Sequence, residues 1–94
     1  MKHGGSPPTP GYGLRVLVVE DRFMVARRLA TLLRELGCEA VGPATALEDG
    51  FRLLQQELDT LDAAVLDIDL KGEPVYPLAR ALLWRRVPLV FATG

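Results

Sequence analysis

The stretch Arg15-Val-Leu-Val-Val-Glu-Asp21 decides the fold, because it is a short apolar run that ends abruptly in two carboxylates. A second stretch, Ala63-Ala-Val-Leu-Asp-Ile-Asp69, has the same character. Neither run alternates between polar and apolar residues, so each predicts a parallel strand covered by helices on both faces. Parallel strands of one sheet end at the same edge, where open α/β folds place their sites. The two stretches therefore predict a crevice lined by carboxylates.

The predicted crevice collects Glu20 and Asp21 from one strand end and Asp67 from the other. Carboxylates held close together repel one another, which favours a divalent cation among them. Mg²⁺ prefers a few carboxylate oxygens plus water and phosphate, and a carboxylate beside it can attack phosphorus. Thr93 ends a later apolar run, where its hydroxyl would reach a phosphoryl oxygen. Singly these residues are common turn formers, but their combination on successive strand ends indicates a functional site.

Helical and extended patterns alternate along the chain. Apolar spacing predicts helices over 22–36, 45–57 and 76–86, and short apolar runs predict strands over 14–19, 38–42, 62–67 and 88–92. This order predicts an α/β fold, an open parallel sheet of alternating βα units with right-handed crossovers. Residues 1–13 are rich in glycine and proline and predict a disordered tail ahead of the domain over 14–94.

The predicted helices carry apolar faces and one clear start signal. The segment Thr45-Ala-Leu-Glu48 has the pattern of a capping box, which predicts Thr45 as the cap of the second helix. Helical spacing predicts that the following residues face the core: Phe23, Ala26, Leu29, Ala30, Leu33 and Leu36 in the first helix, Leu47, Phe51, Leu54 and Leu58 in the second, and Leu78, Leu82 and Leu83 in the third.

Composition restricts the class of protein. The 94 residues carry 11 basic and 12 acidic side chains, a net charge of −1 that argues against a nucleic-acid surface spread over the domain. The single cysteine, Cys38, has no partner for a disulfide within the chain. We find neither a secretory signal nor an apolar stretch near the ~20 residues of a membrane span. These features predict a cytoplasmic protein without a membrane segment.

Three motifs resemble the CheY-like receiver domains of two-component response regulators. They are Val16-Leu-Val-Val-Glu-Asp21, Val65-Leu-Asp-Ile-Asp-Leu70 and Pro88-Leu-Val-Phe-Ala-Thr-Gly94, and the resemblance runs in register from Leu14 to Gly94. It implies a flavodoxin-like fold and a signalling role in a phosphorelay rather than an enzyme. The implied partner is a phosphohistidine donor, either a sensor histidine kinase or a histidine phosphotransfer protein.

The resemblance also implies a role for each site residue. Asp67 would accept the phosphoryl group, and Thr93 would be the switch hydroxyl that turns toward it. Mg²⁺ would be held by Asp21 and Asp67, by Glu20 through water, and by the backbone carbonyl of Asp69. The sequence from Phe91 is similar to the start of the Phe-Ala-Thr-Gly-x-Tyr motif of a subclass nicknamed FAT GUY, whose members are often stand-alone receivers in phosphorelays and stress signalling.

Two departures from the family pattern stand out. Receivers commonly carry proline four places after the phosphoacceptor, where this chain has Lys71, followed by Gly72. The chain also stops after its fourth predicted strand, so we expect the last strand and two helices of the family fold, and the family's lysine, to be lacking. The fourth strand, Leu89 to Ala92, would then be an exposed apolar edge that invites self-association.

Two other functions stay open at this point. Asp67-Ile-Asp69 after an apolar strand also resembles the first motif of haloacid-dehalogenase-type phosphatases, with one aspartate as nucleophile and the other as acid/base. That family usually has Thr or Val at the position of Lys71, and it has no use for an earlier Glu-Asp pair. The other alternative is a receiver-like interaction module that is never phosphorylated, although unneeded buried carboxylates would lower its stability.

Overall fold

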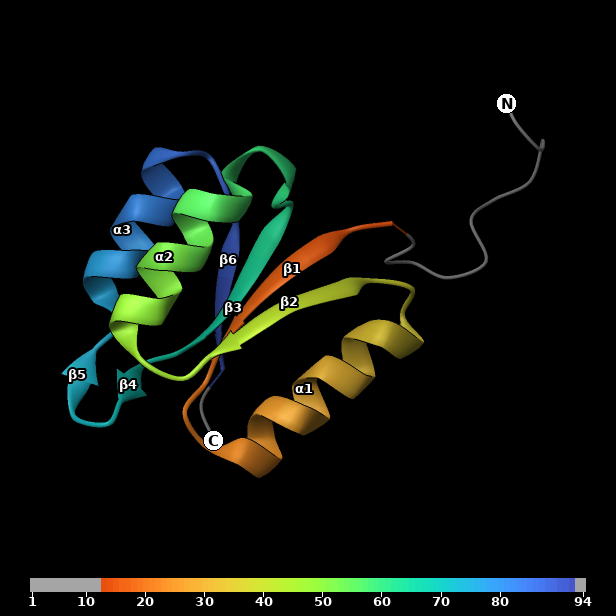
Figure 1. Cartoon of the computed structure of the whole chain (residues 1–94), viewed down its shortest axis with the longest axis horizontal. Helices are drawn as coiled ribbons and strands as arrows, with labels where there is room; N and C mark the ends of the chain where they lie inside the picture. Colours follow the sequence, from red (N-terminus) through yellow and green to blue (C-terminus); the bar gives the residue numbers. More distant parts are fainter. Residues whose placement is uncertain (1–12, 93–94) are drawn as a thin grey trace.

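The computed structural model describes residues 13–92, and within them a four-stranded parallel sheet forms the centre of the molecule. The strands lie in the order β2-β1-β3-β6, so the predicted open parallel sheet is confirmed (Figure 1). The strand bounds are Arg15–Val19 for β1, Glu39–Ala44 for β2, Ala63–Asp67 for β3 and Leu89–Ala92 for β6. The helices are α1 (Phe23–Glu35), α2 (Leu47–Glu57) and α3 (Tyr76–Trp84), with a 3₁₀ turn, η1, over Leu58–Thr60.

The helices form two layers on either side of the sheet. Helices α2 and α3 lie side by side on one face, and α1 covers the other face alone (Figure 1). Strand residues alternate between the two faces. The main core lies under α2 and α3 and includes the fully buried side chains of Leu17, Val19, Leu66, Leu78 and Leu82. Burial of apolar surface at about 25 cal/mol per Å² makes this layer the main source of stability.

Helix α1 buries a narrower stripe than its periodicity predicts. Its buried residues are Ala26 and Ala30, whereas Phe23 is 71% exposed and Leu36 is 46% exposed. The start of α1 extends past the carboxyl ends of the strands (Figure 1), so its first turn has no sheet beneath it. The predicted core position of Phe23 is therefore wrong. The predicted core positions of Leu36 at the other end of α1, of Phe51 in α2 (38% exposed) and of Leu83 in α3 (58% exposed) are wrong as well. Spacing defines a helix face but not how much sheet lies under it.

Two local predictions also differ from the structure. Helix α2 begins after Ala46, whose extended backbone makes it the N-cap, and no side chain caps this helix, so the predicted capping box at Thr45 does not form. Strand β2 runs on through Pro43 to Ala44 instead of ending at Gly42. Strand β2 lies at the edge of the sheet, where the missing N–H of Pro43 is tolerated.

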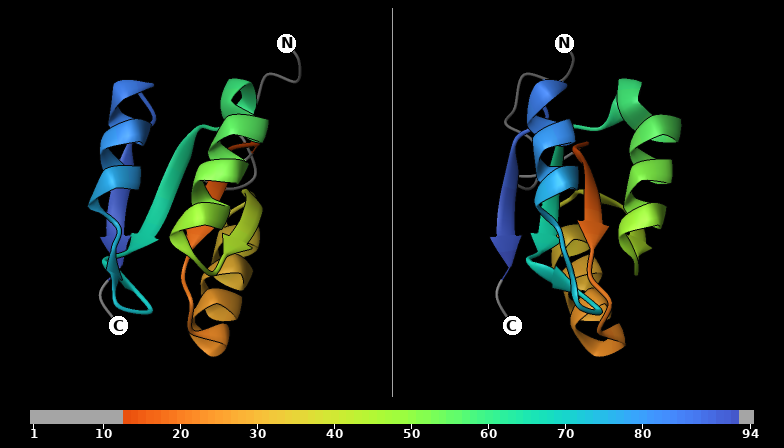
Figure 2. Two further views of the ribbon diagram at one scale, coloured as in Figure 1. Left: turned by 60° about the vertical axis from the view of Figure 1, so that its left-hand side comes forward. Right: turned by 90° about the vertical axis from the view of Figure 1, so that its left-hand side faces the viewer.

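A short hairpin lies between β3 and α3. Strands β4 (Asp69–Leu70) and β5 (Glu73–Pro74) pair antiparallel and enclose Lys71 and Gly72. The hairpin lies beside the carboxyl ends of the parallel strands, which all point the same way in Figure 2. It therefore forms one wall of the crevice that the sequence predicts.

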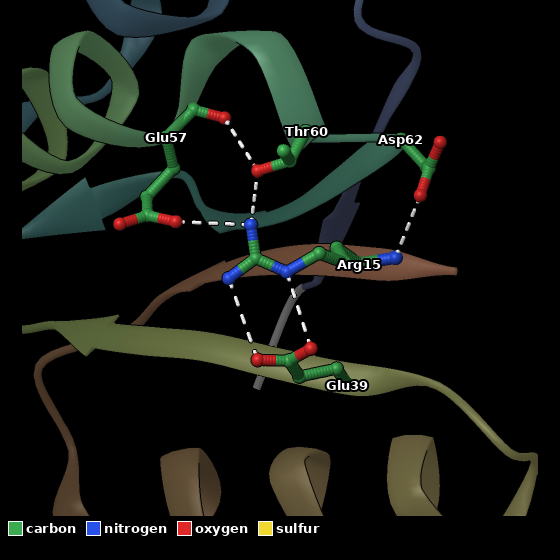
Figure 3. A network of polar contacts seen from close by, with 5 residues as sticks. All are labelled: Arg15, Glu39, Glu57, Thr60 and Asp62. Atoms are coloured by element: carbon green, nitrogen blue, oxygen red, sulfur yellow. Dashed lines mark hydrogen bonds and ion pairs between the residues drawn. The ribbon is translucent and has the colours of Figure 1, made fainter. Parts of the chain in front are cut away.

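The opposite end of the sheet is tied together by Arg15, the first residue of β1. Its guanidinium donates to Glu39 of β2 at 3.2 Å, to Glu57 of α2 at 2.9 Å and to the hydroxyl of Thr60 (Figure 3). Its backbone N–H donates to Asp62 at 2.8 Å. The bonds to Glu39 and then Glu57 raise the pKa of Arg15. The side chain of Arg15 thus ties β1 to β2, α2 and η1 at the end of the sheet opposite the crevice.

The predicted tail over residues 1–13 falls outside the described part of the chain, apart from Gly13. Its N–H donates a hydrogen bond of 3.0 Å to the carbonyl of Gly37. Across residues 13–92, none of the helices has both the length and the apolar character needed to cross a membrane.

Candidate functional site

Three carboxylates meet at the carboxyl edge of the sheet. Glu20 and Asp21 follow the last residue of β1, and Asp67 ends β3. Strands β1 and β3 are paired with Val19 opposite Leu66, so the two strand ends are level. One oxygen from each of the three carboxylates lies within 4.8 Å of the others. The predicted convergence of these strand ends is thus present, and we call these three residues the acidic cluster.

The members of the acidic cluster differ in burial. Glu20 is fully buried, Asp67 is 9% exposed, and Asp21 is partly exposed. Above them opens a pocket of about 470 Å³, whose lining residues are Asp21, Arg22, Asp67, Ile68, Asp69, Lys71 and Gly72. Glu20 does not line the pocket. A ligand entering from solvent would therefore meet Asp21 and Asp67 first.

Asp21 is positioned by the hairpin that follows β3. The backbone N–H of Lys71 donates to Oδ2 of Asp21 at 3.1 Å. Asp67 is held in a similar way, because the N–H of Asp69 donates to its Oδ1 at 3.4 Å. The turn after β3 thus orients one oxygen on each of the two aspartates.

Arg22 is a site residue that our reading of the sequence missed. Glu20 accepts three hydrogen bonds from it: at 2.9 Å from the backbone N–H, at 3.1 Å from Nε and at 3.2 Å from Nη2. Nη2 also lies 4.0 Å from Oδ2 of Asp67. The sequence does show a basic residue two places after Glu20, at the start of a helix. Spacing alone does not tell where the side chain of such a residue points.

The charges of the cluster shift the pKa values of its acids in opposite directions. Burial works to raise the pKa of Glu20, but the hydrogen bonds from Arg22 outweigh it and leave that pKa below its ordinary value. Burial raises the pKa of Asp67, and the negative charge of Glu20 adds to the effect. Glu20 is therefore the carboxylate held ionised, and Asp67 is the acid for which ionisation is disfavoured.

The other predicted site residues are placed as follows. The side chain of Asp69 is exposed and is outside the acidic cluster, while its backbone lies next to Asp67. Thr93 lies outside the described residues, one place after the end of β6. The last described residue of β6, Ala92, pairs with Asp67 of β3.

The donor set of the cluster fits a hard divalent cation. It offers carboxylate oxygens from three residues, and Mg²⁺ prefers such oxygens, completed by water and phosphate. Glu20 and Asp67 are buried at a single site with Arg22 as their ion-pair partner, so a second cation would offset their mutual repulsion. The residues present thus suit Mg²⁺.

Comparison with known proteins gives the fold class. No family model and no curated protein matches the chain. Among solved structures, the response regulator PhyR from Brucella abortus superposes with a TM-score of 0.75 at 22% identity, over 86% of this chain and 34% of that one. A response regulator receiver domain protein from Clostridium thermocellum gives 0.77 at 18% identity, over 86% of this chain and 65% of that one.

A third match is closer in sequence. The solved structure of Sma0114 is 38% identical, with a TM-score of 0.59, over 95% of this chain and 71% of that one. The chain is therefore a relative of Sma0114, and its fold is the CheY-like receiver fold of response regulators. It spans about a third of the length of PhyR (34%) and 65% of the clostridial protein.

Proposed function

We propose that the chain is a response regulator receiver in a two-component phosphorelay, and that Asp67 accepts a phosphoryl group with the help of Mg²⁺. The observation that supports this most is the acidic cluster at the carboxyl edge of a receiver fold. The proposed donor is a phosphohistidine of a sensor histidine kinase or of a histidine phosphotransfer protein. The role is that of a cytoplasmic signalling domain, not of an enzyme, with self-catalysed phosphoryl transfer at most.

The proposed reaction is a displacement at phosphorus. An oxygen of Asp67 attacks, a P–O bond forms, and the P–N bond to the donor histidine breaks. The electron pair of that bond stays on the imidazole nitrogen, which then takes a proton. Asp69 holds Oδ1 of Asp67 through its N–H, so the attacking oxygen would be Oδ2, which lies 4.0 Å from Nη2 of Arg22. Mg²⁺, when bound, neutralises charge on the phosphoryl oxygens.

The proposed division of labour extends to the remaining site residues. Asp21 and Asp67 would hold Mg²⁺ directly, Glu20 would act through water, and the backbone carbonyl of Asp69 would complete the protein ligands. Thr93 would hydrogen-bond a phosphoryl oxygen and signal its presence. The burial of Glu20 beneath the pocket agrees with an indirect contact.

The test is an amide NMR fingerprint of the 94-residue chain before and after adding Mg²⁺ with beryllofluoride, which mimics a phosphoryl group on aspartate. We expect dispersed resonances that shift around Glu20, Asp21 and Asp67. Asp67→Asn should abolish the beryllofluoride response. The matched control Asp59→Asn removes an exposed carboxylate from η1 and should leave the response intact. A folded chain whose spectrum ignores both additions would favour the interaction module that is never phosphorylated.

The variant Asp21→Asn distinguishes the receiver from the phosphatase alternative. In the receiver this substitution removes a direct ligand and should weaken Mg²⁺ binding at least about tenfold, as expected for a lost charged ligand. A phosphatase would depend on Asp67 and Asp69 instead and would tolerate the change. The position of Asp21 in the acidic cluster and the exposed side chain of Asp69 both favour the receiver.

A further inference from the structure

The guanidinium of Arg22 lies beside two of the three carboxylates of the acidic cluster. Its Nε lies 3.1 Å from Oε2 of Glu20, and its Nη2 lies 3.2 Å from Oε1 of Glu20 and 4.0 Å from Oδ2 of Asp67. The planar guanidinium matches the carboxylate of Glu20 with two parallel hydrogen bonds. A single side chain therefore lies across two of the three members of the acidic cluster.

Arg22 supplies positive charge where it is most needed. Glu20 is fully buried, and an isolated buried carboxylate is strongly destabilising unless it is paired. Within residues 13–92, the ion pairs made by the acidic cluster all come from Arg22. The guanidinium and a divalent cation would thus offset the same negative charge at nearly the same place.

The guanidinium of Arg22 is also free to move away from the acidic cluster. Its side chain is 45% exposed and lines the pocket, unlike the fully buried carboxylate of Glu20. It is the N-cap of α1 and lies outside the first helical turn. Rotation about its side-chain bonds would move the guanidinium into solvent without a change in the backbone.

We propose that Arg22 is an internal competitor of the divalent cation: its guanidinium neutralises Glu20 and Asp67 when no metal is bound and turns into solvent when Mg²⁺ binds. This inference rests on the proposed metal site and adds a regulator to it. The competition lowers the apparent affinity for Mg²⁺, because binding must include the breakage of the Arg22–Glu20 pair. It also keeps the acidic cluster folded at low Mg²⁺.

The first test is a Mg²⁺ titration of the 94-residue chain and its Arg22→Gln variant, followed by amide shifts of the acidic cluster. We expect the dissociation constant of the variant to be about tenfold lower, as for the loss of one competing charged hydrogen-bond pair. Thermal melting should show the cost of losing the Arg22–Glu20 pair. In EDTA the variant should have a lower melting temperature than the wild type, and Mg²⁺ should raise that temperature by more in the variant.

Two further variants separate competition from general charge. Arg28→Gln removes the same charge from an exposed position of the same helix and should leave the dissociation constant unchanged. Arg22→Lys keeps the charge but loses the two parallel hydrogen bonds, so its dissociation constant should lie between those of the wild type and Arg22→Gln. An equal gain in Arg22→Gln and Arg28→Gln would overturn the proposal, since it would reflect net charge alone.

A direct readout follows the guanidinium itself. The Nε–H resonance of Arg22 should be protected from exchange with water in EDTA and should lose that protection as Mg²⁺ saturates the site. If the wild type binds Mg²⁺ while this protection persists, or if Arg22→Gln binds no tighter, the competition is refuted and the metal site stands. If neither protein binds Mg²⁺, the proposed function fails and the competition fails with it.

Discussion

The backbone N–H of Lys71 donates a hydrogen bond of 3.1 Å to Oδ2 of Asp21, which joins the β4–β5 turn to the end of β1. Lys71 has a φ of 53°, and Gly72 after it has a φ of 87°. Both values lie in the left-handed region, which disfavours a residue with a side chain by about 1–2 kcal/mol. The turn therefore presents its amide to the acidic cluster through a conformation that proline cannot adopt, since proline fixes φ near about −65°.

Replacing Lys71 by proline, the residue common at this position in receivers, should therefore be harmful in this chain. Lys71→Pro removes the N–H donor and opposes the observed φ, so we expect the free energy of unfolding to fall by about 2–3 kcal/mol. Lys71→Gly keeps the donor and suits the turn, and should stay within about 1 kcal/mol of the wild type. Urea unfolding measures both. Equal stability of the two variants would contradict the left-handed turn.

Gly42 in β2 leaves no room for a side chain between its own strand and β1. A Cβ at this position would lie 2.8 Å from the nitrogen of Ala44 and 2.9 Å from the carbonyl oxygen of Val18, and its φ is 101°. Backbone atoms within a sheet cannot give way easily. Gly42→Ala should lower the free energy of unfolding by about 3 kcal/mol, from overpacking and left-handed strain together. Urea unfolding at neutral pH gives this value.

Gly13→Ala is the matched control for the packing at Gly42. Gly13 also has a positive φ, 83°, but nothing lies within 4 Å of a Cβ built on it. Gly13→Ala should therefore lower the free energy of unfolding by about 1–2 kcal/mol, from left-handed strain alone. A loss at Gly42 no larger than at Gly13 would mean that β2 does not approach β1 as closely as the structure has it.

The acidic cluster could be predicted because it depends on strand ends alone. Two apolar runs that stop at carboxylates fix Glu20, Asp21 and Asp67 once the strands are parallel neighbours. Arg22 could not be predicted in the same way. Its role depends on the direction of one flexible side chain at the start of α1, and helix periodicity carries no information about that direction.

The wrong or missing predictions concern features that depend on how the elements pack together. Phe23 and Leu83 fall on apolar helix positions, yet both side chains are exposed. Thr45 is the kind of residue that caps a helix, but the backbone stays extended after β2 and α2 begins one residue later than predicted, with Ala46 as its N-cap. The β4–β5 hairpin has strands of two residues, too short to show any periodicity.

Asp67 should lower the stability of the protein when no metal is bound. It is 9% exposed, and burial together with the charge of Glu20 raises its pKa. Asp67→Asn removes the disfavoured charge but keeps the shape, so in EDTA at neutral pH we expect the free energy of unfolding to rise by about 1 kcal/mol. Urea unfolding in EDTA measures this gain, and Asp59→Asn, an exposed change in η1, should show none.

The pH dependence of that gain has a definite sign. A raised pKa means that the folded protein binds the proton of Asp67 more tightly than the unfolded chain does. The wild type therefore has the full contribution of this group below the unfolded pKa and loses it as pH rises through the folded pKa. The advantage of Asp67→Asn should be largest at neutral pH and shrink as pH falls. An advantage that grows in acid would refute the raised pKa.

Strand β6 is the edge of the sheet in the described residues, and its outward surface is apolar. Val90 is 61% exposed and Phe91 is 42% exposed, with one side of the strand unpaired. Such an edge pairs with other chains, so we expect concentration-dependent association in sedimentation velocity and its loss in Val90→Lys. Leu32→Lys, at an equally apolar and exposed position of α1 but with no open backbone edge, should leave association unchanged. Association that survives Val90→Lys and disappears with Leu32→Lys would place the contact on α1 instead of on β6.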